Sequence, residues 1–159
     1  MRSVRCALLL AAFLAPARLV AQDSTMSATN MEILKDKLKA DKKLVVASNM
    51  NLTDAEAAGF WPVYDAYQKD LDAINARLLS TIQQYAAAYN ANSMTDDTAK
   101  QLISQATQID VDEAQLQKDY TPKLLKVLPA TKVARYLQIE RKIRAVKYYE
   151  LADQIPLVQ

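Results

Sequence analysis

Residues 52–64 read LTDAEAAGFWPVY, and this stretch decides which fold the rest of the chain can adopt. It holds the only glycine of the chain, Gly59, the only tryptophan, Trp61, and Pro62 directly after it. An interior proline costs a helix about 3 kcal/mol, and a glycine costs about 1 kcal/mol relative to alanine. Apolar residues nevertheless recur at spacings of three and four on both sides of the proline. We therefore predict one continuous, kinked helix, with burial of aromatic side chains offsetting the cost.

Helix-start signals inside this stretch and on both sides of it divide the chain into four helices. The starts are Thr29 with Glu32, Thr53 with Glu56, Thr95 with two acids after it, and Pro129. They predict helices over about 30–48, 54–90, 95–127 and 130–153. With one glycine in 159 residues and no alternating β-branched run, a sheet is excluded. The predicted fold is all-α, an elongated four-helix bundle with a long kinked helical hairpin.

The length of the second helix predicts a thin molecule. Unbroken from 54 to 90, it would extend about 55 Å, whereas a compact domain of this size has a radius of gyration of about 14 Å. A thin bundle leaves part of its apolar stripe uncovered. We therefore expect either a homodimer or a persistent open groove.

Residues 1–21 resemble an export signal, with a basic start followed by a short apolar run. Small residues offer cleavage after Ala17 or Ala21. The run is too short for a permanent membrane span, which takes about 20 apolar residues. We expect a periplasmic protein with no stable membrane insertion, a flexible N-terminus over 22–29 and a single helical domain over 30–155.

Composition argues against catalysis and against nucleic-acid binding. Beyond residue 21 the chain has no histidine and no cysteine, so the usual nucleophile pairs and the ligands of zinc, copper or nickel are missing. The acids of IDVDE, residues 109–113, diverge around a helix and are expected to be a solvated face. We therefore predict neither an enzyme nor a cofactor or metal site. Nearly neutral charge in an exported chain makes nucleic acid a poor partner.

Charge is unevenly distributed along the chain. Residues 54–119 hold 4 basic and 11 acidic groups, whereas 120–159 hold 8 basic and 3 acidic groups. The last helix is therefore expected to face an acidic surface, in its own fold, in a second subunit or on a client. Six basic residues of this helix could form the rim of a groove that attracts an acidic client, or they could pair with the acidic middle region of the same protein, and both alternatives stay open. They are Lys132, Arg135, Arg141, Lys142, Arg144 and Lys147.

The aromatic row of the second helix supplies the candidate apolar contacts. The predicted polypeptide-binding residues are Phe60, Trp61, Tyr64, Tyr67, Arg135, Arg141 and Arg144. Trp61 lies about 100° around the helix from the apolar stripe. It could pack on a neighbouring helix or stand at the edge of an open surface, and packing is favoured because large apolar residues are usually buried.

The stretch NLTDAEAAGF, residues 51–60, resembles the first LTxxQ motif of the Spy/CpxP group of periplasmic proteins, which includes zinc-resistance-type metal sensors. Glu56 replaces the glutamine of that motif, and KVLPATKVARYLQIE, residues 126–140, stands where a second motif would follow. By position, Leu52, Thr53 and Glu56 take structural helix-start roles, and the element around Pro62 suggests a distinct branch. The resemblance implies a cradle-like antiparallel dimer that binds unfolded envelope proteins without ATP or regulates an envelope stress response.

Three functions are consistent with these features. The leading hypothesis is a chaperone-like or stress-regulatory protein that binds polypeptides through an apolar groove with a basic rim. Its partners would be misfolded or unassembled envelope proteins or the periplasmic domain of a sensor kinase. The alternatives are a metal-responsive sensor of the same fold and a structural envelope protein that docks on a fixed partner.

Overall fold

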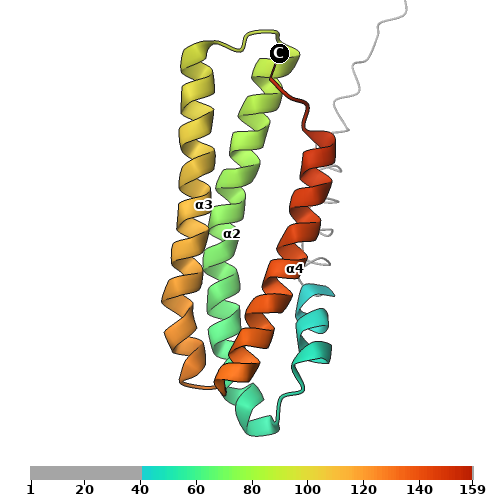
Figure 1. Cartoon of the computed structure of the whole chain (residues 1–159), viewed down its shortest axis with the longest axis vertical. Coiled ribbons are helices and arrows are strands. Elements are labelled where there is room, and N and C mark those ends of the chain that lie inside the picture. The colour runs from blue at the N-terminus through green and yellow to red at the C-terminus, as the bar shows by residue number, and fades with distance from the viewer. Residues whose placement is uncertain (1–40, 159) are drawn as a thin grey trace, which may run out of the picture. The chain divides into compact units, whose positions relative to one another are not determined.

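The computed structural model describes residues 41–158, and every regular element within that range is an α-helix. The long helices are α2 (Asp54–Asn90), α3 (Asp96–Leu125) and α4 (Ala130–Gln154), and residues 41–50 are helical as well. The predicted all-α four-helix fold is confirmed. The expected signal over 1–21, the N-terminus over 22–29 and most of the predicted first helix lie outside the described residues. In Figure 1, α2 and α3 form an antiparallel hairpin, and α4 returns alongside them.

The start of α2 is fixed by the capping box that its sequence predicts. The backbone N–H of Glu56 donates to the Thr53 hydroxyl at 3.3 Å, and the Thr53 N–H donates to Glu56 Oε2 at 2.8 Å. These two bonds satisfy donors that a helix start would otherwise leave unpaired. From there α2 runs for 37 residues with Pro62 inside it. The prediction of one continuous helix through the proline is confirmed.

Gly59 is explained by a close approach between α2 and the turn that joins α3 to α4. A Cβ atom at position 59 would lie 3.0 Å from Val127 Cβ and 3.2 Å from Val127 Cγ1. Real Cβ atoms rarely approach other carbons so closely, because interiors are already densely packed. Glycine therefore permits the contact that brings the α3–α4 turn onto the first turns of α2.

The hydrophobic core lies at the end of the bundle that holds this turn, which we call the proximal end. The opposite end, which holds the α2–α3 turn over residues 91–95, is the distal end. Tyr136 of α4 is fully buried and meets three rings of α2 edge-on, with centroid distances of 5.1 Å to Phe60, 6.0 Å to Tyr64 and 6.2 Å to Tyr67. Edge-to-face pairs of this kind add to the stabilisation that burial provides. The core is completed by Val46, Met50, Leu71, Tyr120, Leu124, Leu128 and Val133.

Candidate functional site

The aromatic row that was predicted to bind polypeptides forms the core of the chain itself. Phe60, Tyr64 and Tyr67 are 0%, 3% and 4% exposed. The expectation that these rings line an open groove is therefore wrong for the described residues. The physical reason is that Tyr136 from α4 and the helical segment before α2 cover the stripe, so no second chain is needed to shield it.

The environment of these tyrosines is dry enough to suppress ionisation. Burial, reinforced by the negative charge of Glu140, raises the pKa of Tyr67 to about 12. The same two causes raise the pKa of Tyr64 and of Tyr136 far above the ordinary phenol value. These phenols are therefore packing groups and hydrogen-bond partners at any physiological pH.

Trp61 packs against its neighbours, which is the alternative that the sequence favoured. Its half-buried ring lies 5.0 Å from the ring of Phe60 and 5.3 Å from that of Tyr64, centroid to centroid. Lys43 covers it from the preceding helical segment, with Nζ 5.1 Å from the ring centroid and an ion pair to Asp65 at 2.8 Å. A cation over an indole face is an attractive arrangement. Trp61 therefore serves mainly to attach residues 43–50 to α2.

Lys132 and Arg144, which belong to the six basic residues expected as a rim, form ion pairs within the chain. Lys132 Nζ lies 2.5 Å from Glu56 Oε2 and donates to the Asn51 carbonyl at 2.9 Å. Arg144 of α4 forms an ion pair with the buried Glu113 of α3. For these two residues the pairing alternative is correct, since each neutralises an acid of the acidic region over residues 54–119.

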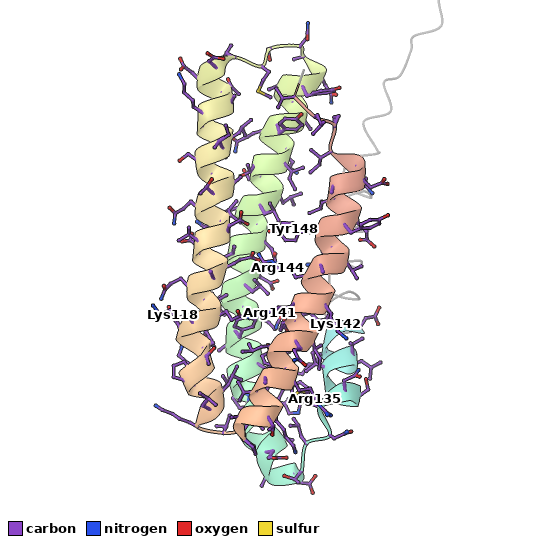
Figure 2. All side chains as sticks on the ribbon, viewed as in Figure 1. Lys118, Arg135, Arg141, Lys142, Arg144 and Tyr148 are labelled. Atoms are coloured by element: carbon purple, nitrogen blue, oxygen red, sulfur yellow. The ribbon has the colours of Figure 1, made fainter. Side chains whose placement is uncertain are left out.

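The remaining basic positions of α4 are divided between two sides of the helix. Arg141 is exposed but donates to Gln117 Oε1 on α3 at 3.2 Å, and Arg135 is exposed with a long contact of 3.4 Å to the Asn49 carbonyl. Lys142 is exposed. In Figure 2, Arg141, Arg144 and Tyr148 lie on the side of α4 that faces the α2–α3 hairpin.

A polar layer, made of the half-buried Gln68 and Arg144 and the buried Glu113 and Glu140, follows the aromatic core toward the distal end. Gln68 Nε2 donates to Glu140 Oε1 at 3.0 Å and to the Tyr136 hydroxyl at 3.3 Å. Glu113 and Glu140 are 7% and 6% exposed. Buried acids are stable only when they are paired or hydrogen-bonded, and this layer meets that condition through Arg144 and Gln68.

The polar layer was only partly visible in the sequence. Glu113 belongs to the IDVDE run that was expected to be solvated, and that expectation is wrong for Glu113, although its position on the apolar stripe of α3 was a signal of burial. Glu140 follows Tyr136 by four residues, which places it on the same face of α4. Its burial could have been inferred from that spacing once Tyr136 was known to face the core.

A second candidate surface lies on α4 opposite its core side. We call it the outer face, and it consists of Arg135, Lys142, Val146 and Tyr149. These positions are seven, four and three residues apart, which places them along one side of a helix. Val146 and Tyr149 are 59% and 78% exposed. Tyrosine and arginine are enriched in protein interfaces, so this face is a candidate contact surface.

The comparisons with known proteins can now be set beside this geometry. The chain matches no protein-family model, no curated protein and no solved structure. The resemblance to the Spy/CpxP group accordingly stays a prediction that rests on residues 51–60 and on the order of the helices.

Two properties of the described part of the chain bear on its chemistry. Across residues 41–158, no three acidic, histidine or cysteine side chains come together in a way that could hold a metal ion. In the same range, no helix combines the length and the apolar character that crossing a membrane requires. The outer face of α4 is where exposed apolar and basic side chains stand together on one side of a helix.

Proposed function

We propose that the protein is a non-catalytic, periplasmic binding protein for other polypeptides, and that the outer face of α4 is its contact surface. The observation that carries the proposal is the 78% exposure of Tyr149, which lies one helical turn from Val146 and two turns from the basic side chain of Lys142. Tyrosine is enriched where proteins bind one another, because its ring gives apolar contact and its hydroxyl tolerates water.

The binding surface is thus placed differently from the groove that the sequence suggested. Phe60, Tyr64 and Tyr67 stabilise the fold, and Arg144 is occupied by Glu113. The partner class remains misfolded or unassembled envelope polypeptides, or a sensor-kinase domain in a regulatory role. A second copy of the chain could use the same face, so a homodimer forms part of the proposal.

An aggregation assay tests the proposal directly. The purified protein, from which residues 1–21 have been removed, is added to an unrelated protein as that protein is diluted from denaturant, and light scattering is recorded. We expect suppression by the wild type and a loss of about threefold or more in the double variant Val146→Ser, Tyr149→Ser. Ile103→Ser is the matched control, since Ile103 is 66% exposed on α3 and lies outside the outer face.

Three outcomes would contradict the proposal in different ways. Absence of suppression by the wild type removes the chaperone-like role, and equal suppression by the double variant moves the surface away from α4. Micromolar binding of zinc, nickel or copper in calorimetric titration would favour the metal-sensor alternative instead. Sedimentation of the wild type and the double variant shows whether the outer face also holds a dimer together.

A further inference from the structure

The attachment of α4 to the rest of the bundle is uneven along its length. Its buried residues are Val133, Tyr136 and Glu140, all in its proximal half. Within α4, which the structure describes in full, no residue after Glu140 is buried. The distal half, residues 141–154, therefore gains little from the hydrophobic effect that fixes the proximal half.

Polar contacts hold the distal half of α4 in place. The ion pair between Arg144 and Glu113 and the hydrogen bond from Arg141 to Gln117 connect it to α3. Directly after the helix, the Pro156 carbonyl accepts a hydrogen bond from the Tyr85 hydroxyl of α2 at 2.7 Å. The hydrogen bonds involve exposed or half-buried groups and contribute modestly to stability, whereas the ion pair joins the buried Glu113 to Arg144, whose side chain is 35% exposed, so salt screens it only in part.

The apolar stripe of α2 continues past the polar layer, and its Tyr85 is bonded to Pro156 just after α4. Its residues continue the spacing of the buried aromatic row, but each is only half-buried: Leu78, Ile82, Tyr85 and Tyr89. The change from buried to half-buried side chains occurs where the polar layer crosses the bundle. The distal part of the stripe therefore has incomplete cover even with α4 in the position seen in Figure 1.

We infer that residues 141–154 of α4 form a hinged flap, which the Glu113–Arg144 ion pair and the Tyr85–Pro156 hydrogen bond fasten over the distal stripe of α2. The hinge lies at the polar layer, because Tyr136 and Glu140 anchor the helix on its proximal side. Opening frees Leu78, Ile82, Tyr85 and Tyr89 to solvent and leaves the aromatic core closed. The inference concerns contacts within one chain and is independent of the proposed function.

Hydrogen exchange measured by mass spectrometry tests the flap. Glu113→Gln removes the charge of the ion pair and nearly preserves the shape of the side chain. We expect amide exchange in residues 145–154 to become about fivefold faster, while residues 131–139 exchange as in the wild type. In the wild type, 1 M salt should produce a smaller acceleration in the same residues, because the buried Glu113 is screened only in part, and it should have little further effect on Glu113→Gln.

The matched control is Lys132→Gln, which breaks the ion pair of α4 at its proximal end. The flap is refuted if this control accelerates residues 145–154 as much as Glu113→Gln does, or if residues 131–139 and 145–154 always accelerate together. Tyr85→Phe is a second, milder probe that removes only the hydroxyl bonded to Pro156. The inference is overturned if Tyr85→Phe leaves amide exchange at residues 150–155 unchanged and Glu113→Gln also gives no support. Glu113→Gln gives no support if it does not fold or if it does not change exchange locally.

Discussion

Truncation of Tyr136 is the most direct test of how the core is closed. The side chain is 0% exposed and contacts three rings of α2. Replacing a buried aromatic residue with alanine removes its transfer free energy and leaves a cavity, which together cost about 3–5 kcal/mol. A domain of this size has about 5–15 kcal/mol of stability in total. We expect Tyr136→Ala to unfold partly at 37 °C or to survive with a much lower urea midpoint.

The conservative variant Tyr136→Phe separates packing from hydrogen bonding. It keeps the ring and loses the hydroxyl, which accepts from Gln68 Nε2 at 3.3 Å and hydrogen-bonds to the Glu140 carboxylate. Gln68 retains its bond to Glu140 at 3.0 Å, so no buried donor is left without a partner. The expected cost is about 1–3 kcal/mol, because a hydrogen bond to a carboxylate is lost.

Urea unfolding of the wild type and both variants can be followed by circular dichroism and by tryptophan fluorescence. Trp61 is the only tryptophan and lies 5.0 Å from the ring of Phe60, so its emission reports on the same core. The two probes should give one transition in each protein. A cost below about 1 kcal/mol for Tyr136→Ala would refute the conclusion that α4 closes the aromatic row.

Three further outcomes are expected. Hydrogen bonding to Lys132 holds the pKa of Glu56 below its ordinary value of 4.5. The pair therefore stabilises the fold at neutral pH, and this stabilisation is lost as the pH falls through the lowered pKa. In NMR titrations, Lys132→Gln should move the titration midpoint of Glu56 upward. Gly59→Ala should lower the free energy of unfolding by about 1 kcal/mol, because the steric overlap of the added Cβ with Val127 exceeds the gain in helix propensity. A raised melting temperature would contradict the close approach. Tyr120 should ionise near pH 12 in an ultraviolet titration, because burial and a hydrogen-bonded carboxylate raise its pKa to about 12, and ionisation near pH 10 would show that the site is wet.

Local signals in the sequence determine most of the secondary structure. The capping box at Thr53 and the threonine at position 95 fix the starts of α2 and α3. The apolar phase across Pro62 correctly predicts one helix, because the phase is continuous and Trp61 would be a poor cap for a new helix. These features depend on residues within a few positions of one another, which is why they can be read without a structure.

The candidate site could not be predicted to the same extent, because it depends on which side of α4 faces inward. Apolar and basic residues alternate around the whole circumference of this helix, so its periodicity does not identify a core side. The pair between Lys132 and Glu56 joins positions 76 residues apart, and Glu113 meets Arg144 across two helices. Such pairings are properties of the packed bundle, and they decide which cations remain available at the surface.

The distance in sequence between Gln68 and Tyr136, 68 positions, has a consequence for the order of assembly. The hairpin of α2 and α3 covers only part of the aromatic row, and α4, which follows α3 after the turn over residues 126–129, completes the cover when it docks. Until it arrives, Phe60, Tyr64 and Tyr67 are in water. We expect the refolding yield to fall steeply at high protein concentration, since partly folded hairpins with solvent-exposed aromatic side chains would aggregate before α4 docks.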